Sequence, residues 1–295
     1  MRKIMIVALF VIIPILAAPW NLSVDANLTL NQNAYSNNWV GGELGTLAWA
    51  FTSNSLAEKQ LHSKINNKNT LKLAYGQTYT QQKDTGATKK WSDPIKSTDL
   101  IDFESVLRFT LGGLVDPFVS GRVETQFYDN SDTTMSRFIN PITLTEAVGI
   151  ARVFIKQEKS ELSSRFGFGL KQLINREVLV DTSYFRNGRR VTQTSNYGGL
   201  NFVTDFKTPL ANERITYTSK LSVFQALFYS EANTLPDTLK NNWKYPDVNW
   251  ENIFTVSITK YLMVNLYVQL LYDKEIATGM RLKQGLALGL TYKLI

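Results

Sequence analysis

Charged residues of both signs recur at two-residue spacing along two neighbouring stretches of the chain. Asp102 and Glu104 lie on the same side of their stretch as Arg108. Arg122 and Glu124 lie on the polar side of the next stretch. Such a group can form ion pairs that neutralise one another and stiffen a wall, or a constriction where opposed charges select solutes. Both interpretations stay open here, and paired carboxylates could also serve acid–base catalysis.

Histidine and cysteine chemistry has little support in the composition. The 295 residues include one histidine and no cysteine. Activation of serine or water near neutral pH usually requires an imidazole, and zinc sites use clusters of His and Cys. His62 falls in a long polar segment, where we expect a solvated turn residue. We therefore expect no enzyme, metal site or cofactor; a hydrolase would require that substitution of Asp102 or Glu104 abolish cleavage.

The stretches that carry the charges alternate apolar and polar residues with a period of two, which is typical of β-strands and not of helices. The C-terminal stretch shows this most clearly, because Leu282, Leu286 and Leu288 alternate with Lys283, Gly285 and Ala287. In the stretch at 145–155 both faces are almost equally apolar, so its phase stays open. Twelve stretches share the alternation, around residues 22–30, 47–51, 71–79, 101–111, 119–127, 145–155, 162–170, 200–206, 215–223, 250–258, 262–270 and 282–294.

The pattern predicts an all-β fold, a transmembrane antiparallel up-and-down β-barrel of about 12 strands with an apolar outside and a polar lumen. We expect a signal peptide at 1–18, because Arg2 and Lys3 precede an apolar run and two alanines. The barrel then spans 19–295. The five charges face the lumen, and so by the same parity do Arg165, Lys171, Lys220, Glu251, Lys283 and Lys293, which makes the lumen slightly cationic.

Connection lengths support a barrel independently. Outer-membrane barrels have short periplasmic turns and long outer loops. Short connections at 112–114, 156–160, 207–212 and 259–261 alternate with long ones at 33–42, 81–96, 128–144 and 230–247. The segment 53–67 departs from this rule, because it is a long connection on the expected periplasmic side.

Two outer connections carry candidate binding residues. The RNGR sequence at 186–189 is a type I′ hairpin signal, so we expect the flanking strands to project as a ribbon crowned by Arg186, Arg189 and Arg190. These arginines could bind anionic lipopolysaccharide or a partner, or could simply be solvated. Trp243 and Tyr245 could stack on a glycan, or could pack against the barrel mouth.

The last stretch resembles the signal that outer-membrane barrels present for assembly. Gly289 is followed by Tyr292 and Leu294, although the chain ends in Ile295 and not in phenylalanine. We therefore expect barrel-assembly machinery and outer-membrane lipid, including lipopolysaccharide, as partners. No basic patch indicates nucleic-acid binding.

The run NQNAYSNNWVGGE at 31–43 resembles the opening motif of an uncharacterised Gram-negative family, the domain of unknown function 3078 (DUF3078). LKLAYG at 71–76 and PITL at 141–144 resemble downstream features of the family, so the resemblance covers about half the chain. It implies an outer-membrane location. It brings no known substrate or catalytic residue.

Two functions fit these observations. The first is a passive channel for small hydrophilic solutes, with a preference for anions if the lumen conducts. The second is a non-conducting surface barrel whose extracellular loops bind a glycan or a protein partner. Twelve strands lie between small filled barrels and open porins, so size does not choose between them.

Overall fold

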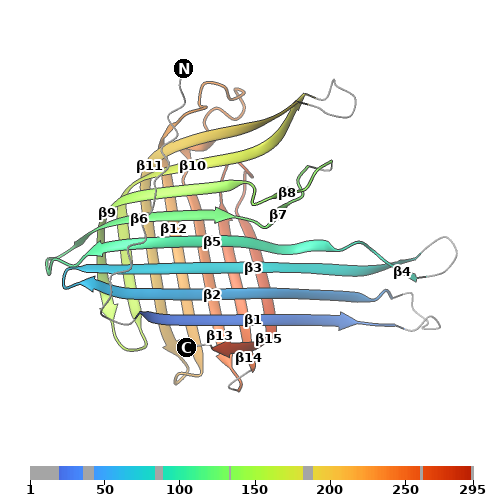
Figure 1. Ribbon diagram of the computed structural model, residues 1–295, viewed down its shortest axis with the longest axis horizontal. Helices are drawn as coiled ribbons and strands as arrows, with labels where there is room; N and C mark the ends of the chain where they lie inside the picture. Colours follow the sequence, from blue (N-terminus) through green and yellow to red (C-terminus); the bar gives the residue numbers. More distant parts are fainter. Residues whose placement is uncertain are drawn as a thin grey trace.

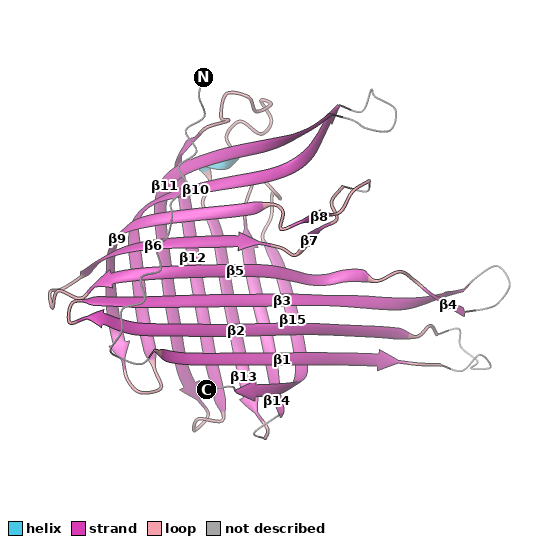
Figure 2. Ribbon diagram, in the orientation of Figure 1, coloured by secondary structure: helices cyan, strands magenta, loops and turns pink. Residues whose placement is uncertain are grey.

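The computed structural model describes residues 20–35, 43–83, 89–132, 134–181, 189–259 and 262–293, and the fold is all-β (Figure 2). The expected signal peptide at 1–18 and Arg186 lie outside these residues. No helix in the described ranges is long and apolar enough to span a bilayer. The elements are β1 (Asn21–Asn33), β2 (Thr46–His62), β3 (Ile65–Lys83), β4 (Lys89–Trp91), β5 (Ile95–Phe109), β6 (Asp116–Thr125), β7 (Tyr128–Asp129), β8 (Arg137–Phe138), β9 (Ile142–Lys156), β10 (Glu161–Asp181), β11 (Arg189–Leu210), β12 (Ile215–Tyr229), η1 (Asn242–Lys244), β13 (Asp247–Ser257), β14 (Leu262–Tyr272) and β15 (Arg281–Lys293).

Twelve of these strands form one antiparallel ring, which confirms the predicted fold class. Each of the twelve pairs with the next of them along the chain. The short strands β4, β7 and β8 lie in the connections and are not part of the ring. The ring closes through β1 and β15 over five residue pairs, from Asp25 opposite Lys293 to Thr29 opposite Gly289. In Figure 1, β1, β2, β3 and β5 cross the front of the barrel while β12 to β15 run across them behind. Two walls of the ring therefore face each other across the lumen.

The outer wall exposes a belt of large apolar side chains, as the two-residue alternation predicts. Phe51, Phe103, Phe166 and Leu286 all point outward and are 40% exposed or more. Burying such a surface against lipid and not water is what stabilises a membrane barrel. Aromatic rings in contact mark both ends of the belt: Trp49, Tyr75, Tyr128 and Phe138 towards the long loops, and Phe206, Tyr217 and Phe254 towards the short turns.

The structure settles the phase of β9, which the sequence leaves open. Val148 and Ile150 point outward and are exposed, whereas Ala147 and Ala151 are buried on the lumen side. The same inner row contains a close approach to β10. A Cβ on Gly149 would lie 2.2 Å from the backbone oxygen of Phe166 on β10, so the two strands can approach this closely only with glycine.

The connections sort by length as predicted, with one correction. The expected long connection at 53–67 is wrong, because β2 continues to His62 and β3 starts at Ile65, with a two-residue turn between them. Both faces of these strand ends are polar, so the alternation disappears although the ladder continues. Asn67 and Asn69 help to hold this end, since their side-chain amides donate to backbone oxygens of Val106 and Ala57.

Candidate functional site: the barrel lumen

Asp102 on β5 and Arg122 on β6 form a forked ion pair on the inner wall. Arg122 Nε donates to Asp102 Oδ1 at 2.7 Å, and Nη2 donates to Oδ2 at 2.9 Å. The same Nη2 lies 2.9 Å from Glu124 Oε2. Because the guanidinium is planar, the two parallel bonds fix both side chains against the wall.

Glu104 extends this group across the lumen. Its Oε2 accepts a hydrogen bond from Lys220 Nζ at 2.7 Å, and its Oε1 lies 2.8 Å from Arg165 Nη2. Lys220 is on β12 and Arg165 on β10, and neither strand is a neighbour of β5 in the ring. The three side chains are at most 13% exposed. Charges this buried are stable only when they are paired.

A second ion pair joins the opposite walls. Lys72 Nζ on β3 lies 2.7 Å from Glu251 Oε2 on β13, and these strands also lie far apart in the ring. Beside Glu104, the guanidinium of Arg165 lies 5.8 Å from the ring of Phe118, which is only 2% exposed. One side of the lumen, from β5 to β13 through β10, is therefore packed with side chains.

Arg108 does not join the other four charges of the predicted cluster. Its Nε lies 3.8 Å from Asp116 Oδ2, at the end of β5 next to the short turn. The structure thus brings Asp102, Glu104 and Arg122 together with Glu124, and leaves Arg108 in a separate pair.

The side of the lumen formed by β15, β1 and β2 is the more open one, although Asn27 in the middle of β1 faces inward and is buried. Lys283 and Gly285 of β15 face inward and are exposed, as is Asn54 of β2. A Cβ placed on Gly285 would meet no atom within 4 Å. Arg281, at the outer end of β15, has a buried Nε with no hydrogen-bond partner among the described residues. Of the two basic residues, Lys283 is therefore the one that faces open space, and Arg281 is only partly exposed.

The projecting ribbon of β10 and β11 forms as predicted, and Arg190 is not free on it. Arg190 Nη1 lies 2.7 Å from Asp132 Oδ2, and Nη2 donates to Thr134 Oγ1 at 2.7 Å. Hydrogen bonds from Thr134 and Arg190 hold the pKa of Asp132 below its usual range. Arg190 thereby ties the connection between β6 and β9 to the ribbon, and Arg189 remains exposed beside it.

A buried polar group anchors the β7–β8 hairpin in the same place. Asn140 is fully buried, and its Nδ2 donates to Asp129 Oδ2 at 2.8 Å and to Asn175 Oδ1 at 2.9 Å. Arg137 Nη2 lies 2.6 Å from Asp129 Oδ2. No local sequence pattern predicts this group, because three of its members lie in the connection between β6 and β9 and the fourth, Asn175, lies on β10.

The two aromatic residues of the predicted loop site have different environments. Trp243 packs against Tyr229 at the barrel mouth, with ring centroids 6.1 Å apart. Tyr245 is 42% exposed, and Lys274 Nζ lies 3.4 Å from its ring centroid. Only Tyr245 of the two offers a ring face outside the barrel mouth.

His62 ends β2 in an exposed position. Its Nδ1 lies 3.2 Å from Ser63 Oγ, the neighbouring residue. Among the described residues no carboxylate hydrogen-bonds to either group, so a third group to orient the imidazole is missing there. Within the described part of the chain, no three His, Cys, Asp or Glu residues are placed to hold a metal ion.

Parity within each strand places Lys72, Asp205 and Arg281 on the inner face, but the sequence analysis did not single them out. Asp205 is a second acidic neighbour of Arg165, with 3.6 Å between Oδ2 and Nη2. Alternation could have found Lys72 and Asp205, because each lies on the polar face of its strand. In the structure Lys72 lies opposite Asp102, and Asp205 lies opposite Lys220.

A family model matches part of the chain. Residues 30–130 match the model described as Protein of unknown function (DUF3078). The match confirms the resemblance from the end of β1 to β7, a range that includes Asp102, Glu104 and Arg122. The motif at 141–144 lies outside it, and so do Arg165 and Lys220, the partners of Glu104. A comparison with curated protein sequences finds no match.

The barrel is similar in architecture to several solved structures. One is an outer-membrane channel from Pseudomonas putida F1, with 11% identity, a TM-score of 0.42, and 95% of this chain and 96% of that chain covered. Another is the β domain of the Bordetella autotransporter BrkA, with 13% identity, a TM-score of 0.36 and coverage of 92% and 98%. A third is the translocator domain of the autotransporter NalP from Neisseria meningitidis, with 10% identity, a TM-score of 0.36 and coverage of 92% and 88%.

Proposed function

We propose that this protein is an outer-membrane channel that passes small hydrophilic solutes, with a preference for anions, along the open β15–β1–β2 side of its lumen. The observation that carries the proposal is the inner face of β15. Gly285 faces open space, and Lys283 is exposed inside a barrel whose other side is packed. A solvated strip of wall is what a narrow pore requires.

The charges on that strip support the preference for anions. Arg281 and Lys283 form no ion pair with a described acidic residue, whereas the basic groups of the packed side are neutralised by Glu104, Asp102 and Glu251. The field along the outer half of the open side is therefore positive, while Asp25 and Glu58 lie on the inner face of β1 and β2 nearer the short turns. Unpaired basic groups in a narrow, partly desolvated passage concentrate anions and repel cations.

Ion selectivity in planar bilayers tests this proposal. In a salt gradient the purified protein should open in discrete steps. The sign of its reversal potential should be that of an anion-selective channel. Lys283→Glu combined with Arg281→Glu should shift that potential towards cations, and Lys156→Glu, an exposed position on the outer face, should not. An unchanged reversal potential in the double variant contradicts the assigned pathway.

The ion pairs that cross the lumen support a second possible function, that of a non-conducting barrel. If they close the barrel, it is a non-conducting surface protein whose outer loops, with Tyr245 and Arg189 exposed, bind a glycan or partner. Electrical silence of correctly folded wild-type protein would select this function. Both functions include export by residues 1–18 and insertion by barrel-assembly machinery into the outer membrane, with lipopolysaccharide around the loops.

A further inference from the structure

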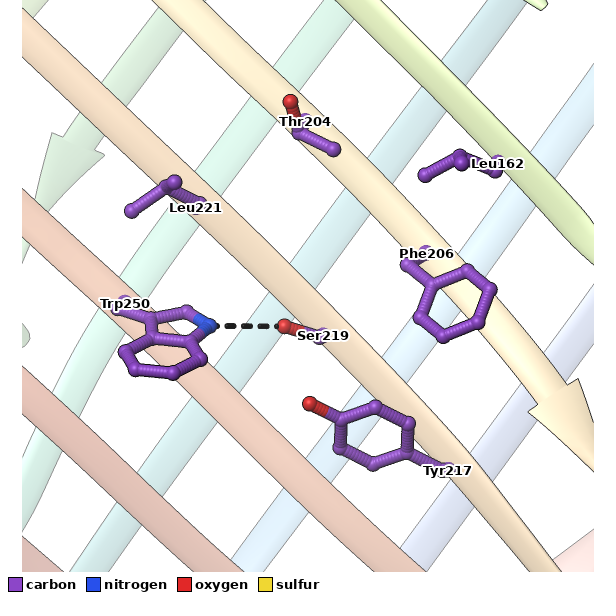
Figure 3. Close-up of a pocket in the computed structure, with 7 residues that line it drawn as sticks. All are labelled: Leu162, Thr204, Phe206, Tyr217, Ser219, Leu221 and Trp250. Carbon is purple, nitrogen blue, oxygen red and sulfur yellow. Dashed lines mark hydrogen bonds between the residues drawn. The ribbon is translucent and has the colours of Figure 1, made fainter. Parts of the chain in front are cut away.

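A hollow lies in the outer wall of the barrel, on the side that faces the membrane. It measures about 370 Å³ and is lined by residues of β10 to β13 (Figure 3). Ser219 lies between the rings of Trp250 and Tyr217, and Thr204 lies at the far edge. Small polar residues thus sit among bulky apolar ones, within a belt that is otherwise apolar. The lining consists of Leu162, Thr204, Phe206, Tyr217, Ser219, Leu221 and Trp250.

The polar groups of the hollow are joined by hydrogen bonds along the wall. Trp250 Nε1 donates to Ser219 Oγ at 3.0 Å, and Ser219 Oγ donates to Asn252 Oδ1 at 3.1 Å. Asn252 Oδ1 also accepts from Tyr217 at 2.6 Å. Ser219 is therefore satisfied as donor and acceptor, and it forms the floor of the hollow and not a binding group.

The hydroxyl pair beside it is not satisfied. Ser164 Oγ and Thr204 Oγ1 lie 2.9 Å apart and share one hydrogen bond. Two hydroxyls carry two hydrogens, so one hydrogen has no acceptor among the described residues. The Nδ2 group of Asn252 likewise donates to no described residue. Spare donors are costly in hydrocarbon, so the site suits a ligand that supplies an oxygen acceptor.

The height of the hollow indicates which ligand supplies it. A tilted strand rises about 2.5 Å per residue along the barrel axis, so the 15 residues of β12 span about 38 Å. An apolar band of about 25 Å centred on this wall begins about 6 Å from the strand ends. Ser164 lies three residues from the short-turn end of β10, at about 8 Å. That is just inside the edge of the apolar band, where the ester groups of glycerophospholipids lie.

We propose that this hollow binds one glycerophospholipid of the leaflet on the short-turn side, with an acyl-ester carbonyl accepting a hydrogen bond from the Ser164–Thr204 pair. The acyl chain then lies against Leu221 and Trp250. This proposal needs a membrane-spanning barrel but not a conducting one, so it stands or falls separately from the channel.

Competition between two synthetic lipids tests the hydrogen bond. Native mass spectrometry of the protein in mild detergent would compare retention of a diacyl phosphatidylethanolamine with its dialkyl ether analogue, which has no carbonyl. The wild type should retain the ester lipid about threefold to tenfold better. Ser164→Ala with Thr204→Val removes both hydroxyls and should abolish this difference. Equal retention of the two lipids by the wild type would overturn the proposal.

A filling substitution tests the location. Ser219→Phe places a ring in the hollow and should remove the retained lipid, whereas Val256→Phe adds the same ring to the belt outside it. A cooperative unfolding transition in each variant shows that the barrel has folded. Retention by the Ser219→Phe variant would mean that the lipid binds elsewhere and would refute the site. Selective retention of lipopolysaccharide by the wild type would refute the assigned ligand. The same holds if the wild type forms a dimer and Ser219→Phe abolishes the dimer but not lipid retention.

Discussion

Replacing Glu104 by glutamine should destabilise the barrel more than any other single change in the lumen network. The variant keeps the size of the side chain but removes the negative charge that Lys220 and Arg165 share. Removing one partner of a buried ion pair costs about 3–5 kcal/mol, because the remaining charge stays desolvated. Arg165 keeps Asp205 at 3.6 Å, so we expect a loss near the lower end, about 3 kcal/mol.

Urea unfolding of the barrel in lipid vesicles measures this loss as a shift of the midpoint at constant slope. The control is Glu213→Gln, which breaks the ion pair between Glu213 Oε2 and Lys159 Nζ, 2.5 Å apart. The side chains of Glu213 and Lys159 are 60% and 54% exposed. Solvent screens that pair, so its loss should leave the midpoint unchanged. Adding Lys220→Met to Glu104→Gln should recover part of the stability. Equal midpoints for Glu104→Gln and wild type would refute the account of a sealed, desolvated network.

Three further predictions address the close approach of β9 to β10, the outer loops and their pH dependence. Gly167→Ala should prevent closure of the barrel and lower the yield of folded protein, because the added Cβ would lie 2.1 Å from the backbone oxygen of Val148; normal yield would show that β9 and β10 can separate. Arg190→Gln should raise hydrogen exchange in the loop around Asp132 and leave the unfolding midpoint unchanged, whereas unchanged exchange would show that other contacts hold the loop. Burial raises the pKa of Glu275 above its ordinary value of 4.5, so the folded loop favours the protonated acid and loses stability as pH rises through that pKa. Thermal unfolding at a series of pH values should show that Glu275→Gln removes this loss, and parallel pH profiles would contradict it.

The sequence was sufficient for the number of strands and for most of their faces, because lipid on one side and water on the other impose alternation on a strand. It did not reveal which inner charges meet. Lys72 and Glu251 are 179 positions apart and lie on strands that never pair, so no local pattern joins them. Alternation also failed where its cause disappears. At the ends of β2 and β3 both faces are polar, and in β9 the inner face is apolar because Ala147 and Ala151 pack against Phe118.

The proposed pathway depends on water reaching the inner face of β15, and thiol accessibility measures this directly. The chain has no cysteine, so Gly285→Cys introduces the sole thiol of the protein. In planar bilayers a charged methanethiosulfonate reagent should modify this cysteine quickly and reduce the conductance. The same reagent should leave Ala147→Cys, which faces the lumen on the packed side, unmodified. An unreactive Gly285→Cys, or an unchanged conductance after its modification, would contradict an open passage along β15.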